Sequence, residues 1–268
     1  MSPRLVHAGA ALAVVLLGAA GCGGEAVQEA AERSSNPVVA AAGHAADEET
    51  AALALTMQVG GETITGEGVF DLKEGDQGRL TLTVPGPTPA SLEMRVVDGD
   101  VFVMVPGLDA EQPGKRWVRI DPEAAGGTPA DALGLQNPTE LIALIGSAAS
   151  FEETGVETVR GEAMALWSGT LDLTALASDP GAAQRLDDMG VGQLPTEVAI
   201  DGEDRLRLVR VTIDLGAIAQ GEGQTLPSGA PTEIVASLEL FDFGVPVDVE
   251  APPAAEVIDA PAPALMTS

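Results

Sequence analysis

A two-residue alternation of apolar and polar side chains is the feature that most limits how this chain can fold. It runs through residues 53–59, 80–84 and 92–96, where leucine, methionine or valine alternates with smaller or polar residues. Successive side chains of a β-strand point to opposite faces, so each stretch is predicted to form a strand with one buried and one exposed face.

Two Asp-Gly pairs indicate how some of these strands are joined. Asp98-Gly99 lies between residues 91–97 and residues 100–105, both of which read as strands. A two-residue type I′ turn needs a positive φ at both central positions, which Asp-Gly tolerates well. Asp201-Gly202 is predicted to join two later strands, residues 196–200 and 205–215, in the same way.

Other predicted strands are apolar on both faces. Residues 101–105 read Val-Phe-Val-Met-Val, and residues 234–240 carry an isoleucine, a valine, an alanine and two leucines. A strand of this kind must be covered on both sides. The cover could be helices, a second sheet or a ligand, and the pattern alone leaves these three alternatives open.

Two short amphipathic helices are available as a cover. The first is predicted over residues 138–146, after Asn137 as N-cap and with Pro138 at the first helical position. The second is predicted over residues 178–189, with Gly190 as its end. The sequence contains ten or eleven predicted strands and these two predicted helices. Together they predict a single α+β domain over residues 51–250.

The N-terminus has the pattern of a bacterial lipoprotein signal. Arg4 provides the charge, residues 8–20 are apolar apart from glycine, and Ala19-Ala20-Gly21 precedes Cys22, the only cysteine. We therefore predict a signal peptide over residues 1–21 and acylation of Cys22, with the mature protein anchored by lipid to the extracytoplasmic face of the cell membrane.

Composition predicts loose segments on either side of the domain. Residues 22–50, rich in Gly, Ala, Glu and Ser, are predicted to form an acylated, flexible tether. Residues 251–268, rich in Ala and Pro, are predicted to form a loose tail.

Charge and the scarcity of catalytic side chains limit the function. Against 41 Asp and Glu stand 13 Lys and Arg, a net charge of −28, which repels nucleic acid. The chain has no tyrosine, and removal of the signal would leave His44 as its single histidine and no free thiol. These residues do not provide the usual parts of nucleophilic or zinc chemistry, so we predict no enzyme activity, no metal site and no cofactor.

Local motifs support the same conclusion. The Asp-Gly pairs lack the ligand spacing of a calcium loop, and turn chemistry explains them. The paired carboxylates Glu152-Glu153, and Glu239 with Asp242, do not define a catalytic pair by spacing. The densest basic patch is Lys115-Arg116 with Trp117 and Arg119. An exposed strand face explains this patch better than a phosphate or headgroup site.

Several segments, taken in order, resemble a known family. Residues 96–103 (VVDGDVFV), 106–108 (PGL) and 114–122 (GKRWVRIDP) are followed by the GVETVRG of residues 155–161, the LPTEVAID of residues 194–201 and the close FDFGVPVDVEAPP of residues 241–253. This order is similar to that of the LppX/LprAFG-type lipoproteins of actinobacteria. The likeness extends over residues 51–253.

The resemblance implies a fold like that of the lipoprotein carriers LolA and LolB. In that fold a strongly curved antiparallel sheet forms a half-barrel, short helices cover its mouth, and acyl chains of lipids or lipoglycans lie between them. The chain departs from the family pattern in having Phe102 and Trp167 where tyrosine is usual, and in having more acidic residues and few aromatic ones.

The predicted function is that of a lipid-anchored protein that binds or carries acyl lipids or lipoglycans in an apolar groove, without chemistry. Its predicted partners are the lipid ligand, the membrane reached through its own acyl chains, and an envelope transport protein, but no nucleic acid. The alternative is a non-enzymatic surface adaptor or sensor with a closed core. The residues predicted to line the groove are small or aliphatic: Val101, Val103, Val105, Leu141, Leu144, Ile145 and Val235.

Overall fold

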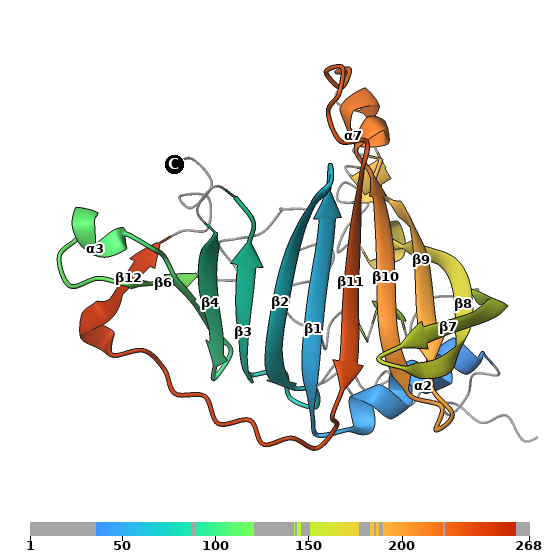
Figure 1. Ribbon diagram of the computed structural model, residues 1–268, viewed down its shortest axis with the longest axis horizontal. Helices are drawn as coiled ribbons and strands as arrows, with labels where there is room; N and C mark the ends of the chain where they lie inside the picture. Colours follow the sequence, from blue (N-terminus) through green and yellow to red (C-terminus); the bar gives the residue numbers. More distant parts are fainter. Residues whose placement is uncertain are drawn as a thin grey trace, which may run out of the picture.

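A computed structural model describes residues 36–86, 89–120, 142, 144–145, 151–176, 183–184, 186–187, 190–221 and 223–260. Within this part of the chain, twelve strands form one sheet in the order β12-β6-β5-β4-β3-β2-β1-β11-β10-β9-β8-β7 (Figure 1). The strands are β1 Thr50–Val59, β2 Glu62–Asp71, β3 Gln77–Val84, β4 Ala90–Val97, β5 Asp100–Met104, β6 Trp117–Ile120, β7 Phe151–Val159, β8 Glu162–Asp172, β9 Gln193–Ile200, β10 Leu206–Asp214, β11 Glu233–Phe241 and β12 Val257–Ala260.

Helices are few and short among the described residues. They are α2 Pro37–Asp47, α3 Leu108–Glu111 and α7 Leu215–Gly221, with 3-10 turns at Leu173–Leu176 and Ala254–Glu256. None of these helices combines the length and the hydrophobicity that crossing a bilayer requires. Of the two predicted helices, residues 142 and 144–145 of the first and residues 183–184 and 186–187 of the second are described, and these residues are helical.

The predicted α+β fold with a curved sheet is confirmed. Every neighbouring pair of strands is antiparallel except β12 and β6, which run parallel. The sheet is open, since β12 and β7 lie at its opposite edges. The sheet has one strand more than the ten or eleven predicted, because β12 lies in the segment that was predicted to be a loose tail. There, backbone pairing with β6 orders residues 257–260.

Helix α2 corrects the prediction for residues 22–50, because part of the expected tether is folded. Asn36 caps the helix, its side-chain Oδ1 accepting the N–H of Val38 at 3.0 Å, and Pro37 occupies the first helical position. Val38, Ala41, Ala42 and Ala45 are completely buried against the sheet. Their loss of contact with water stabilises a helix whose composition alone suggests a flexible segment.

The predicted turn at Asp98-Gly99 is confirmed. Asp98 has φ 53° and Gly99 φ 80°, and the pair joins β4 directly to β5. The same two-residue geometry occurs at Gly60-Gly61 and at Arg160-Gly161, where both residues of each pair also have positive φ. Since these turns match the twist of the flanking strands, they set the registers of three hairpins.

The two-residue turn predicted at Asp201-Gly202 is wrong. Residues 201–205 form a longer loop in which Asp204, not Gly202, has the positive φ of 57°. The Asp201 Oδ1 atom accepts the backbone N–H groups of Glu203 and Arg205 at 3.0 and 2.9 Å. A side chain that binds its own backbone in this way replaces the turn that the dipeptide alone would favour.

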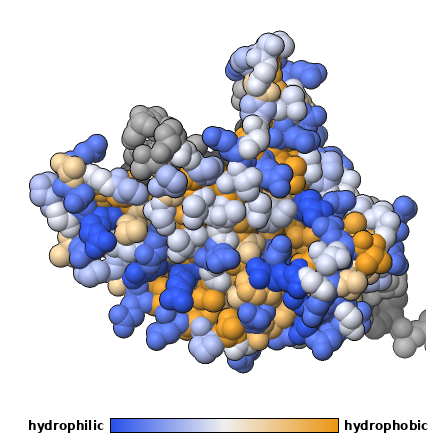
Figure 2. All heavy atoms as spheres, viewed as in Figure 1, coloured by the Kyte–Doolittle hydropathy of each residue, from blue (hydrophilic) through white to orange (hydrophobic). Residues whose placement is uncertain are grey.

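The main core lies on one side of the sheet, called here the inner face. It is one contiguous cluster that joins apolar residues of β1 to β5 and β7 to β11 to α2, Leu173, Val191 and the helical residues Ile142, Leu144 and Ile145. The opposite, outer face is turned toward the viewer in Figure 2. It shows many hydrophilic side chains with smaller hydrophobic areas between them.

The β7–β8 hairpin folds back over the outer face. In Figure 1, β7 crosses in front of β9 and β10. Beneath it, Val159, Met164, Ala199 and Leu208 form a second, small apolar cluster. Three arginines join the two layers at its border, through the ion pairs Arg210–Glu157, Arg207–Glu162 and Arg160–Glu239. The sheet is therefore doubled at this end.

Candidate functional site

The inner face is a nearly continuous apolar surface, because strand registers align apolar residues across the sheet. One row runs from Leu240 on β11 through Leu53, Gly68, Leu80 and Met94 to Val103 on β5. Apart from Glu62 beside the β1–β2 turn and Glu153 on β7, no position that the registers place on the inner face of the described strands carries a charged residue. An apolar surface of this kind favours hydrocarbon over a charged ligand.

Most of the predicted lining residues that the structure describes come together on this face. Val101 is buried in the main core, Val103 packs against it half-buried, and Leu144 and Ile145 belong to the same cluster. Val105 lies just beyond the end of β5 and is half-buried, with its N–H donated to the Arg116 carbonyl at 3.0 Å. Leu141 and Cys22 lie outside the described residues.

The prediction that Val235 lines the groove is wrong, because Val235 lies on the outer face. On β11, Ile234, Ala236, Leu238 and Leu240 are the residues that point to the core, so Val235 points the other way. The sequence pattern showed that both faces of this strand are apolar but did not show which face is the inner one.

Val235 instead borders a depression of about 450 Å³ at one end of the sheet. This depression lies between the β1–β2 turn and the loop before β11, and Gln58, Glu62 and Glu233 also line it. None of the helical core residues lines this depression, so it is separate from the predicted groove.

Burial of the inner face differs between parts of the sheet. On β9 and β10, Val198, Val209 and Val211 are 0–3% exposed. On β3 to β6 the cover of this face is mixed, since Leu80, Val96 and Val101 are 5–8% exposed, whereas other residues on the same side are only half-buried. The half-buried residues are Leu82, Met94, Val103 and Ile120. The apolar face is therefore closed by the protein on one side and incompletely covered on the other.

Three inner-face glycines do not widen this face, because neighbours occupy the space that each leaves. A Cβ on Gly66 would lie 2.7 Å from Leu82 Cδ2, and one on Gly78 would lie 2.4 Å from the Phe70 ring. At Gly68 the obstacle is backbone, with the Arg79 carbonyl oxygen at 2.1 Å. The strands β2 and β3 are thus tightly packed at these positions.

Sequence reasoning missed two parts of the inner face. The first is α2, although Asn36-Pro37 is the same N-cap signal that identified the helix after Asn137. The second is Trp167 on β8, whose indole ring packs against the main core. Its Nε1 atom is buried and has no hydrogen-bond partner among the residues that the structure describes. A buried donor without a partner costs about 1–3 kcal/mol.

The basic patch of residues 115–119 is neutralised by the C-terminal segment, which runs along the end of the sheet to reach β12 (Figure 1). Lys115 donates to the Val257 carbonyl at 2.8 Å, and Arg116 pairs with Glu256. Arg119 pairs with Asp100 and Asp259, which raises its pKa. These cations hold β12 in place, so the patch is structural and does not present free charge to a phosphate.

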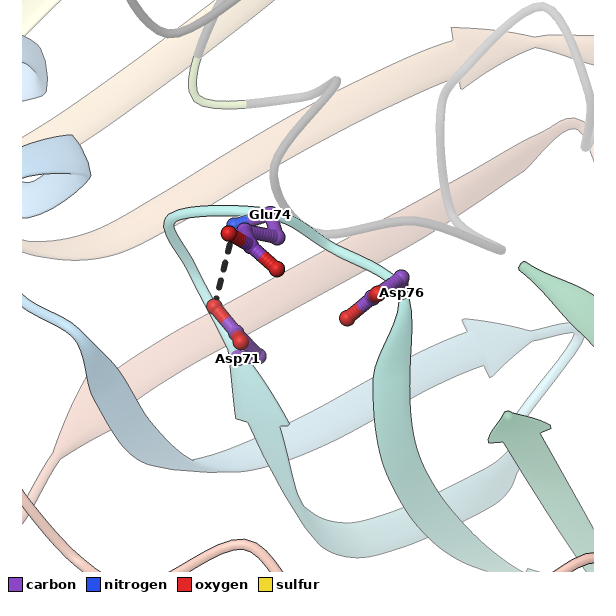
Figure 3. A group of neighbouring side chains, drawn as sticks. All are labelled: Asp71, Glu74 and Asp76. Carbon is purple, nitrogen blue, oxygen red and sulfur yellow. Dashed lines mark hydrogen bonds between the residues drawn. The ribbon is translucent and has the colours of Figure 1, made fainter. Parts of the chain in front are cut away.

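Three carboxylates gather in the β2–β3 loop, at Asp71, Glu74 and Asp76, with one oxygen of each within 4.8 Å of the others (Figure 3). Asp71 accepts the backbone N–H groups of Lys73 and Glu74 at 2.8 and 3.0 Å, which caps the turn. Turn chemistry accounts for Asp71, and exposed carboxylates are expected in a chain with 41 acidic residues.

The carboxylates singled out in the sequence do not form a catalytic pair. Glu152 and Glu153 are exposed neighbours on β7 and point to opposite faces. Glu239 is paired with Arg160. Asp242 is exposed, and its own backbone has a positive φ of 47°. Their geometry matches surface positions and a turn better than a site with paired acids.

Comparisons with known proteins concern the fold. No known family model matches the chain, and no curated protein matches its sequence. Among solved structures, LprF from Mycobacterium bovis is 14% identical with a TM-score of 0.46, over 85% of this chain and 97% of LprF. LppX from Mycobacterium tuberculosis is 14% identical with a TM-score of 0.45, over 84% of this chain and 99% of LppX.

Proposed function

We propose that this protein binds an acyl lipid against the inner face of its sheet and carries or presents it without chemistry. The observation that supports this proposal is the incomplete cover of the inner face. Leu82, Met94, Val103 and Ile120 form an apolar surface that the protein's own helices leave half-buried. An acyl chain laid along this surface would remove both itself and these side chains from water.

The free energy of moving an acyl chain into water is large enough that a carrier would speed lipid transfer. Moving an acyl chain of about sixteen carbons into water costs about 12 kcal/mol, at about 0.8 kcal/mol per methylene. Transfer between membranes without a carrier is therefore slow. A dry apolar face lowers this cost by desolvation alone and requires no nucleophile, acid or metal.

We further propose that Cys22 is acylated and anchors the protein to the extracytoplasmic face of the membrane. In that arrangement the chain up to Asn36 links the membrane to α2, the first element that the structure describes. Metabolic labelling with a clickable fatty acid tests this anchor, since Cys22→Ser would abolish labelling.

Detergent-free purification followed by lipid mass spectrometry tests the binding function, with Leu82→Asn and Thr83→Asn as a matched pair. The two positions are adjacent on β3, but Leu82 faces inward half-buried and Thr83 faces outward exposed. We expect acyl lipid to copurify with the wild type and with Thr83→Asn, and to be depleted at least about five-fold from Leu82→Asn, which loses more than 1 kcal/mol of apolar contact.

Thermal unfolding of each variant controls for loss of the fold. Absence of lipid from well-folded wild-type protein, together with no uptake of a fluorescent acyl ester, would refute the carrier proposal. In that case the alternative function, a non-enzymatic surface adaptor with a closed core, is favoured by the complete burial of the inner face on β9 and β10.

A further inference from the structure

One hydrogen-bond donor on the inner face has no acceptor among the described residues. The Trp167 indole Nε1 is buried, and none of the described residues accepts its hydrogen. Buried polar groups in folded proteins nearly always have a partner, and a buried tryptophan usually finds one for its N–H. This exception therefore points to an acceptor that is not part of the described chain.

The position of Trp167 connects this donor to the proposed binding face. In the register of the sheet, Trp167 lies directly opposite Val198 of β9, a completely buried member of the main core. The indole ring packs against that same core, which includes the helical residues Leu144 and Ile145. The donor is thus on the same face of the sheet as the half-buried apolar residues of β3 to β6, with β2, β1, β11, β10 and β9 between β3 and β8.

The neighbours of Trp167 on the inner face are small. Ala165 and Gly169 flank it along β8, and Gly169 lies opposite Thr196 of β9. The Thr196 hydroxyl donates to the Leu194 carbonyl at 3.0 Å, so its hydrogen is already used. Trp167 is consequently the available donor in this part of the described inner face.

Charge limits the kind of acceptor that fits. Among the described strands, the inner face carries no lysine or arginine, and the residue directly opposite Trp167 on β7 is Glu153. A carboxylate or phosphate placed beside the indole would lack a counter-ion and would be repelled by Glu153. A neutral carbonyl satisfies the donor without this cost.

We infer that the Trp167 indole N–H donates a hydrogen bond to the neutral carbonyl of a bound acyl ester or amide, and so selects such lipids over free fatty acids and plain hydrocarbons. This inference rests on the proposed function, because it names the chemical class of the ligand for the same face. Trp167 contributes the polar contact that fixes where the acyl group ends, and the surrounding apolar residues bind the chain.

Competition binding with the full chain tests the inference. Methyl hexadecanoate, heptadecane and hexadecanoate are compared as competitors for a fluorescent acyl ester, with wild type and with Trp167→Phe. We expect the ester to bind better than the other two, and Trp167→Phe to weaken ester binding about five-fold, equivalent to about 1 kcal/mol. Heptadecane affinity should be the same for both proteins. Trp117→Phe, which changes the other tryptophan, is the control.

A second measurement does not depend on how well Trp167→Phe folds. In protein labelled with ¹⁵N at its two tryptophans, the indole N–H signal that persists in Trp117→Phe belongs to Trp167. We expect this signal to move downfield with methyl hexadecanoate and not with heptadecane, because only the ester offers a hydrogen-bond acceptor.

Each result decides one of the two proposals. If ester and hydrocarbon lose affinity equally in Trp167→Phe, or if neither loses any and the signal does not move, lipid binding stands and the role of the indole N–H is overturned. A signal that is already downfield and unaffected by ester means that water satisfies the donor, which also overturns it. If none of the competitors binds the wild type, the binding function itself fails.

Discussion

At the scale of single residues, arginine organises the doubled end of the sheet. Asp201, whose side chain is 7% exposed, binds Arg205 and Arg207 through its Oδ2 atom at 2.9–3.0 Å. Arg207 also donates to the Leu240 carbonyl at 2.8 Å, which ties β10 to β11. Burial acts to raise the pKa of Asp201, but the hydrogen bonds that it accepts outweigh this and lower it. A buried carboxylate is tolerated here because its acceptor sites are satisfied.

The pair formed by Glu157 and Arg210 predicts sensitivity to acid. Hydrogen bonds from Arg210 lower the pKa of Glu157 below its ordinary value of 4.5, although burial opposes this. A carboxyl with a lowered folded pKa stabilises the protein fully above its unfolded pKa and loses that contribution as pH falls through the folded value. We therefore expect the urea midpoint to decrease below about pH 4.5, and to decrease less in Glu157→Gln.

Urea unfolding from pH 7 to 3 measures this effect. Arg210→Met serves as the matched variant, since it removes the partner that lowers the pKa. Arg210→Met and the double variant should both show the reduced pH dependence of Glu157→Gln. Additive losses in the double variant would show that the two residues act independently.

At the scale of secondary-structure elements, α2 belongs to the domain and is not part of a tether. The Asn36 cap and the burial of Val38, Ala41, Ala42 and Ala45 place one face of the helix against the core. His44 Nδ1 lies 2.9 Å from the Asp204 carbonyl oxygen, and Glu48 lies near Arg205. The β9–β10 loop therefore holds the C-terminal end of α2.

Ala42→Asp tests whether α2 is docked. Ala42 is completely buried, so an aspartate there would place an unpaired charge in the core. We expect it to reduce the free energy of unfolding by at least about 3 kcal/mol, measured by urea denaturation. Asp47→Ala, at an exposed position of the same helix, should change it by less than about 0.5 kcal/mol. Equal, small effects of both substitutions would favour a flexible tether.

At the scale of the whole molecule, the net charge of −28 opposes compactness. Added salt screens repulsion between carboxylates more than it weakens the partly buried arginine pairs. We expect the free energy of unfolding to rise by about 1 kcal/mol between about 0.02 and 0.5 M NaCl, or about 2–4 °C in the melting temperature.

Thermal unfolding monitored by circular dichroism measures this salt effect. KCl at the same ionic strength should give the same shift, because screening does not depend on the identity of the cation. A melting temperature that falls with salt would mean that the ion pairs of the outer face contribute more than the overall repulsion costs.

Local features were predictable from sequence because their causes lie within a few residues. The alternation in residues 53–59 predicted β1. The Asp98-Gly99 pair predicted the β4–β5 turn from backbone preference alone. Asp201-Gly202 failed because the Asp201 side chain binds backbone N–H groups and two arginines, which a dipeptide rule does not include. The two-faced strands, the short helices and the family motifs predicted the curved α+β fold.

The amino-acid sequence by itself determined which segments form most of the strands, how the β4–β5 hairpin turns, and that the sheet needs a cover, because these follow from side-chain period and backbone preference. Only the tertiary structure decided that α2 is buried, that β12 pairs with β6 and that Val235 faces outward. It also decided that Trp167 faces inward with an indole N–H that none of the described residues accepts. Each of these depends on contacts between residues far apart in the chain, and the face that a strand buries is set by its neighbours in the sheet.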